Sequence, residues 1–205
     1  MYIPDSNLMA DTTEAVEFMQ RFSFATIITA KNNLPVATHL PFLVAIKDEN
    51  ITLTSHFARA NEQWKDIENN KVLVIFSEPH AYISPRHYDK KLNVPTWNYI
   101  SVHAYGKGKL ITEMSKVFEV LERTIENYEV LYKDQWNNLP GDYKTGLAKG
   151  VVAFDMEVTD LQGKKKLSQN KTENEQQKII NALSKSEDTN EKLIADYMKR
   201  NQQNK

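Results

Sequence analysis

Cysteine is absent from this sequence of 205 residues. Its absence excludes disulfide bonds, metal sites built on thiolates and cysteine nucleophiles, and it fits a reducing compartment. Long hydrophobic runs are missing too, because no stretch approaches the roughly 18 consecutive apolar residues of a membrane-spanning helix. Residues 1–10 show no charged segment followed by an apolar one, as a secretory signal would. We therefore expect a soluble, cytoplasmic protein with no membrane partner.

A large excess of charge of either sign is also missing. The formal net charge is −1 at pH 7, so no overall positive field would draw the chain to nucleic acid. Hydrophobic residues make up 40% of the chain, which separates it from disordered proteins. The length fits one domain, with room for a small appendage.

Familiar catalytic motifs are missing as well. Residues 106–108 read GKG, which matches neither the GxGxxG nor the Walker phosphate loop. The sequence has no HExxH zinc motif and no GxSxG nucleophile elbow. We therefore expect no metal site and identify no catalytic residue, although Tyr99 and His103 are the nearest candidates for protonating a substrate.

Short β-rich runs follow one another through most of the chain. They cover residues 24–30, 35–46, 51–57, 71–77, 80–84, 94–111 and 151–161. Tight turns join most of these runs, which favours an antiparallel sheet closed into a barrel over βαβ units. Pro41 cannot donate to a sheet, so it indicates an edge or a bulge within the second run.

Helical patterns are fewer and lie mostly at the two ends of the chain. Helices are expected at 11–22, 59–69 and 115–132, with two more in the tail from residue 172. Thr172 and Glu175 have the spacing of a capping box at the start of the tail. The proline, glycine and asparagine content of residues 134–146 predicts a loop.

A row of rings with polar edges lies in the run from residue 94. Trp97, Tyr99, His103 and Tyr105 occupy odd positions, and the even positions from 100 to 106 are small or aliphatic. Because side chains alternate along a strand, the rings share one face. Such a face suits a dimer interface. It also suits a platform for a flat aromatic ligand, whose edge Asn98 would read, and a ligand seated between subunits would use both.

Polar residues converge where a strand ends and a short helix begins. His56, Arg59 and Asn61 stand at this junction, and free N–H groups at a helix start suit an anion. The alternative is that Arg59 is solvated and Asn61 only caps the helix.

A second polar segment reads KKKLSQNK over residues 164–171. Runs of charge are usually solvated faces. The alternative is that Lys166, Ser168 and Gln169 reach a phosphate or the polar edge of a ring.

Six segments in order resemble the PaiB-type family of FMN-binding negative transcriptional regulators. They are MYIP (1–4), HLPF (39–42), SHFARANEQW (55–64), PHAYISP (79–85), VPTWNYISVHAYG (94–106) and KLSQNK (166–171). The resemblance covers nearly the whole chain, and six ordered matches are far more specific than one. The family is similar to the FMN-binding split barrels that include pyridoxamine-phosphate oxidases and flavin reductases. It implies a mainly β fold with peripheral helices, built on a six-stranded antiparallel split barrel.

The resemblance also implies a homodimer with one FMN per subunit in a cleft between the chains. The residues that it implies near the flavin phosphate are Ser55, His56, Arg59 and Asn61. Trp97, Asn98 and Tyr99 would line the isoalloxazine ring, and the segment containing Ser168 and Gln169 would approach from the partner chain. Residues 1–171, with the 115–132 helix, would form the flavin domain. Residues 172–205 would be a helical extension packed on the barrel or on the partner subunit.

The implied function is FMN binding with a regulatory role or a flavin-dependent redox role, and oxidoreductase activity stays open. One alternative is a flavin-independent repressor that binds DNA or a regulatory protein. Another is a haem-binding split barrel, with His56, His80 and His103 as the available ligands. These histidines could equally complete hydrogen-bond networks, as buried polar groups normally do.

Overall fold

The computed structural model describes residues 1–203, and the last two residues of the expected 172–205 extension lie outside the described part. The described chain forms two compact units, each built from separate stretches. Unit 1 comprises Met1–Ala15, Ser77–Val102 and the chain from Gln162, and unit 2 comprises Val16–Phe76 and His103–Leu161. Three strands and one helix contribute residues to both units, because each boundary falls inside one of these elements.

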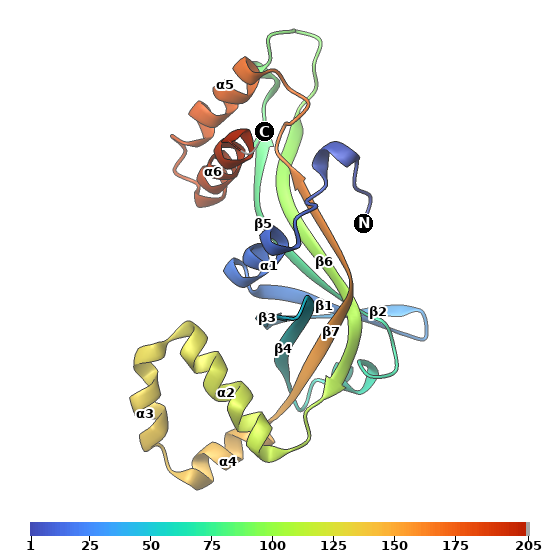
Figure 1. Ribbon diagram of the computed structural model, residues 1–205, viewed down its shortest axis with the longest axis vertical. Coiled ribbons are helices and arrows are strands. Elements are labelled where there is room, and N and C mark those ends of the chain that lie inside the picture. Colours follow the sequence, from blue (N-terminus) through green and yellow to red (C-terminus); the bar gives the residue numbers. More distant parts are fainter. Residues whose placement is uncertain (204–205) are drawn as a thin grey trace. The chain divides into compact units, whose positions relative to one another are not determined.

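The strands confirm the expected mainly β, antiparallel fold (Figure 1). They are β1 (Phe24–Lys31), β2 (Leu34–Pro41), β3 (Leu43–Lys47), β4 (Asn50–Ala58), β5 (Val72–Ile83), β6 (Thr96–Leu110) and β7 (Val151–Lys166). Their order in the sheet is β2-β1-β5-β6-β7-β4-β3, and the β1–β2, β1–β5, β3–β4 and β4–β7 pairs are antiparallel.

Helices and short 3-10 turns make up the rest of the described secondary structure. They are α1 (Thr12–Arg21), α2 (Met114–Tyr128), α3 (Lys133–Asn138), α4 (Gly141–Lys149), α5 (Glu173–Leu183) and α6 (Thr189–Gln203). Short 3-10 turns are η1 (Asp5–Asn7), η2 (Glu62–Asp66), η3 (Pro85–His87) and η4 (Val130–Tyr132). The capping box at Thr172 is confirmed, because its side chain accepts from the Glu175 amide while the Glu175 carboxylate accepts from the Thr172 amide.

The structure has seven strands where the resemblance implies six. The run from 35 to 46 is divided at Phe42 into β2 and β3, and the runs 71–77 and 80–84 join into the single strand β5. The amide of Phe42 donates to the carbonyl of Ser23, next to the last β1–β2 pair, Phe24 and Pro41. The two resulting strands, β2 and β3, lie at opposite ends of the strand order. The edge position expected from Pro41 is confirmed, since Pro41 ends β2 at the sheet margin.

The predicted loop at 134–146 is wrong. Helix α3 and helix α4 occupy most of this segment in unit 2, beside α2 (Figure 1). Trp136 of α3 is buried, and its indole N–H lies 3.3 Å from a carboxylate oxygen of Glu122 on α2. Packing of this ring against α2 overrides the helix-breaking content of the local sequence.

The core of unit 2 is built from stacked and edge-on phenylalanine rings. Phe154 lies 5.1 Å from Phe57 and 6.2 Å from Phe42, and Phe42 lies 5.8 Å from Phe76, between ring centroids. All four side chains are fully buried. In unit 1, α5 and α6 pack together beside the ends of β5 and β6 (Figure 1) and bury the apolar residues Ile179, Ile180, Leu183, Ile194, Ala195 and Met198.

Candidate functional site

The two faces of β6 differ sharply within unit 1. Trp97 is 52% exposed, whereas Asn98, the next residue, is completely buried. Neighbouring side chains on a strand point to opposite faces, so Trp97 and Asn98 cannot present their side chains to the same surface. The structure thus places on opposite faces of β6 two residues that were both expected to line the isoalloxazine ring.

The exposed face gathers four rings, which we call the aromatic face: His80, Tyr82, Trp97 and Tyr99. The Trp97 ring centroid lies 5.9 Å from that of His80 and 5.9 Å from that of Tyr82, both on β5. Tyr82 is 48% exposed, so much of this ring surface is open. Sequence reasoning missed His80 and Tyr82 as members of this face, although their alternation in PHAYIS is a usable signal.

A nearly buried lysine adjoins the aromatic face. Lys164 is only 8% exposed, and its Nζ donates to the carbonyl oxygen of Tyr2 at 3.0 Å. The same ammonium lies 5.2 Å from the ring centroid of Tyr99 and 5.7 Å from that of Tyr2. Within residues 1–203, no ion pair neutralises Lys164. Such a charge is rarely buried unless something compensates for it.

The opposite face of β6 meets the turn that follows β7. Ser168 has a positive φ of 59°, and its hydroxyl donates to Oδ1 of Asn98 at 3.0 Å. Asn98 also directs its Nδ2 toward Sδ of Met198 on α6 at 3.5 Å. Gln169 closes the turn by accepting from the amide of Leu167 at 2.6 Å. These bonds hold the turn against β6.

The lysines of residues 164–171 do not form a solvated face. Lys165 makes an ion pair with Glu14 at 2.7 Å, and Lys166 donates to Oγ1 of Thr96. Lys171 donates to Oδ1 of Asn93 at 3.1 Å. A cavity of about 240 Å³ lies between this segment and residues 88–98. Three of the predicted site residues, Asn98, Lys166 and Ser168, line it.

Unit 2 contains the other predicted group, which is Ser55, His56, Arg59 and Asn61. Ser55 and Arg59 donate to backbone carbonyls of the same unit. Ser55 donates to the carbonyl of Pro41 at 2.6 Å. Arg59 donates through Nε and Nη2 to the carbonyls of Lys149 and Val151, at 2.6 and 2.8 Å. The capping role foreseen for Asn61 is confirmed, since its side chain accepts from the amide of Gln63 at 3.1 Å. Burial lowers the pKa of His56, so this side chain is uncharged at neutral pH.

Two further rings of the predicted row lie in unit 2. His103 and Tyr105 have centroids 6.4 Å apart, and Nζ of Lys71 lies 5.1 Å from the centroid of Tyr105. Burial also lowers the pKa of His103. Among the described residues, no group of three or more histidine, aspartate or glutamate side chains could hold a metal ion.

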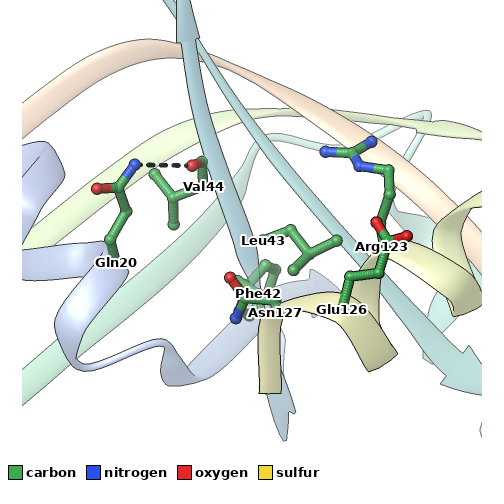
Figure 2. Close-up of a pocket in the computed structure, with 7 residues that line it drawn as sticks. All are labelled: Gln20, Phe42, Leu43, Val44, Arg123, Glu126 and Asn127. Atoms are coloured by element: carbon green, nitrogen blue, oxygen red, sulfur yellow. Dashed lines mark hydrogen bonds between the residues drawn. The ribbon is translucent and has the colours of Figure 1, made fainter. Parts of the chain in front are cut away.

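One cavity in unit 2 contains none of the predicted site residues. It has a volume of about 540 Å³ and lies between α1, residues 42–44 and α2 (Figure 2). Gln20 donates to the carbonyl of Val44 at 3.1 Å across one side of it, and Arg123 and Glu126 of α2 lie on the other. The polar side chains of its lining, on α1 and α2, do not form one cluster that would bind a single ligand.

No helix among residues 1–203 is long and apolar enough to cross a membrane. Solved structures share the fold. The flavocytochrome Anf3 of Azotobacter vinelandii has a TM-score of 0.60 at 17% identity, covering 76% of this chain and 67% of that one. The FAD and heme binding protein of Mycobacterium smegmatis has a TM-score of 0.62 at 11% identity, covering 78% and 73%. The fold is thus the split barrel expected from the sequence.

Sequence comparison identifies the family. Protease synthase and sporulation protein PAI 2 of Bacillus subtilis is 39% identical over 202 residues, covering 97% of this chain and 96% of that protein. An uncharacterized protein of Emericella nidulans is 26% identical over 186 residues, covering 72% and 74%. The family model described as "Putative FMN-binding domain" matches residues 1–160. The chain therefore belongs to this FMN-binding domain family and is a homologue of the PaiB-type proteins expected from its motifs.

Proposed function

We propose that this chain binds FMN with the isoalloxazine ring stacked on the aromatic face of unit 1, and that it serves a regulatory or flavin-dependent redox role. The observation that carries the proposal is Trp97, which stays 52% exposed although two other rings lie within 6 Å of it. Tryptophan is a large apolar side chain whose exposure in a ring cluster is typical of a binding surface.

The residues present fit a flavin. A flat ring system needs an apolar ring on which to stack, which the half-exposed Trp97 offers. The Tyr82 ring meets Trp97 edge-on at 74° and would border the stacked flavin. Its carbonyl edge needs donors, and the ammonium of Lys164 has three, of which the Tyr2 carbonyl takes one. Lys164 was not among the predicted flavin residues. Its position between Tyr2 and Tyr99 adds it to the proposed site.

FMN, when bound, supplies the electron-transfer chemistry, and the protein supplies binding, orientation and electrostatics. Trp97 and Tyr99 would set the plane of the ring. Lys164 would hold a positive charge in a poorly solvated position, where it stabilises negative charge more strongly than in water. Ser55, His56, Arg59 and Asn61 stay in the proposal as a second group of flavin residues, supported by the resemblance of SHFARANEQW.

We also propose that the chain is a homodimer and that a second copy covers the aromatic face. Tyr2, Tyr82 and Trp97 are all exposed in unit 1. Tyrosine and tryptophan are enriched at interfaces between subunits, where the ring is covered and its polar atom is bonded. The division into a flavin domain (1–171) and a helical tail is retained, with α5 and α6 forming the described part of the tail.

The test is a titration of FMN fluorescence against purified protein, with the molar mass measured by light scattering on the same samples. We expect saturable quenching by the wild type, and about tenfold weaker binding by Trp97→Ala, because a lost ring contact contributes up to ~1.5 kcal/mol. Tyr143→Ala is the matched control, since Tyr143 is an exposed ring of unit 2. Equal binding by wild type and Trp97→Ala would exclude the aromatic face.

The two roles separate in a second measurement on the FMN-loaded protein. Bleaching of the flavin absorbance by a reduced nicotinamide, followed by recovery with an acceptor, supports the redox role. Bound flavin that resists reduction under these conditions supports the regulatory role, in which the flavin changes what the protein binds.

A further inference from the structure

The cavity beside the turn at residues 166–171 in unit 1 has the features of a binding site that the proposed flavin platform does not use. It lies between the turn at residues 166–171 and residues 88–98, on the buried face of β6. Asn98 lines it, whereas Trp97 on the exposed face does not. At about 240 Å³ it is smaller than the roughly 300–1,000 Å³ of pockets for drug-sized ligands, so its guest is small.

The charged side chains that line the cavity are all positive. Among the described residues that line it, Lys166 and Lys171 are cationic and none is acidic. Each ammonium donates one bond to a neutral oxygen, that of Thr96 or that of Asn93, and keeps two further donors. The buried carboxylate of Glu175 does not line the cavity and makes no hydrogen bond to either lysine; it accepts from the amides of Asp89 and Thr172, although its charge is felt by Lys171 and Tyr88. The lysine donors are thus available to a guest.

A second, independent observation is the hydroxyl of Tyr88. Tyr88 lines the cavity and is only 8% exposed. Its hydroxyl is buried with no hydrogen-bond partner among the described residues. Buried polar atoms are nearly always paired, and leaving one unpaired costs about 1–3 kcal/mol. Nζ of Lys171 lies 3.8 Å from the centroid of the same ring, so a guest near that ammonium is within reach of Tyr88.

We propose that this cavity binds the oxyanion group of a small anion, a phosphate or carboxylate, through Lys166, Lys171 and the hydroxyl of Tyr88. Ammonium groups and a hydroxyl are the donors that such oxygens accept, and bonds to charged groups are the stronger kind. Two sources share this chemistry: a free small metabolite, or the phosphate end of a flavin.

The test is isothermal titration of the full-length protein with inorganic phosphate and with succinate. We expect saturable binding of at least one probe, weakened about tenfold by Tyr88→Phe, which removes only the hydroxyl. Lys171→Gln should weaken it by at least as much. Lys178→Gln is the matched control, since Lys178 is an exposed lysine of α5 paired with Asp89 and does not line the cavity.

Because the hydroxyl has no described protein partner, Tyr88→Phe should not lower the unfolding midpoint and should raise it if the unpaired hydroxyl is costly, which separates a binding role from a structural one. The proposal is overturned if neither probe binds saturably up to tens of millimolar. It is also overturned if Tyr88→Phe and Lys171→Gln bind like the wild type, or if Lys178→Gln weakens binding equally.

Riboflavin and FMN distinguish the two sources. If Lys171→Gln weakens FMN but not riboflavin, the flavin phosphate occupies the cavity. If it weakens the small anions and leaves both flavins unchanged, the guest is a separate metabolite. Failure of the wild type to bind riboflavin or FMN would refute only the aromatic-face proposal, because the titrations with phosphate and succinate do not depend on flavin binding.

Discussion

The two compact units bury different kinds of polar side chain. The buried polar residues of unit 2 are neutral: Ser23, Thr29, Thr54, Ser55 and Gln63. The charged side chains that are buried within residues 1–203 are Lys164 and Glu175, and both belong to unit 1. Burying a charge is costly unless partners compensate for it. Unit 2 is thus organised by packing, whereas unit 1 also buries charge. Glu175 accepts from two backbone amides and caps α5, but Lys164 has no ion-pair partner among the described residues, so its use is sought in binding.

The largest expected effect concerns the packed phenylalanine core of unit 2. Phe154→Ala removes a ring that contacts both Phe57 and Phe42, and it should destabilise the protein by about 3–5 kcal/mol through lost burial and a cavity. Urea unfolding followed by fluorescence measures the loss. Leu131→Ala, a truncation at a highly exposed position of the same unit, should change stability by less than about 0.5 kcal/mol. Similar losses in both variants would refute a ring-based core.

A smaller effect, on binding rather than on folding, is expected for Lys164→Met. Methionine keeps the length of the side chain and removes the charge, so FMN affinity should fall about tenfold, the equivalent of one bond to a charged group. Stability should change by less than about 1 kcal/mol, because replacing a buried charge with an apolar group of similar size is often neutral.

Lys164→Arg, which keeps the charge, is the control for this substitution and should retain binding. The comparison fails if Lys164→Met unfolds the protein or binds FMN as tightly as the wild type, since Lys164 would then serve packing only. Fluorescence titration and thermal melting of the same samples give both readouts.

The smallest effect concerns Glu175. The hydrogen bond from the Asp89 amide, opposed in part by burial, lowers the pKa of this carboxyl below its ordinary value of 4.5. A lowered pKa stabilises the fold above pH 4.5, and this contribution is lost as the pH falls through the folded-state pKa. Glu175→Gln should therefore melt below the wild type at pH 7, with the gap closing as the pH falls below 4.5 and through the folded-state pKa. A gap that stays constant with pH would show that ionisation of Glu175 is irrelevant.

Features governed by neighbouring residues were predictable from the sequence. Asn32 and Asn33 form the turn after β1 with φ of 51° and 64°, a conformation that asparagine tolerates. Thr172 starts α5 as its capping box indicates. The first feature depends on the backbone preference of the residue itself and the second on a residue three positions away, so the local sequence is enough for both.

The composition of the candidate site was less predictable. The alternation of β6 correctly indicated one aliphatic face, and Ile100, Val102 and Ala104 are fully buried. The grouping of Asn98 with Trp97 did not follow the same alternation. Lys164 was overlooked because its partner, the carbonyl of Tyr2, is 162 residues away in the sequence. No local pattern distinguishes a lysine that is buried by such a contact from one in a solvated run.

By itself, the sequence determined the β-rich content, the positions of most strands and turns, and the family, because these follow from side-chain periodicity, backbone preferences and motifs in order. Only the tertiary structure decided which lysines are buried, which rings stay exposed and where Tyr88 and Lys171 meet. These properties depend on residues brought together from Met1–Ala15, Ser77–Val102 and the chain beyond Gln162. Burial and charge compensation are properties of such assemblies and have no counterpart in a local stretch of chain.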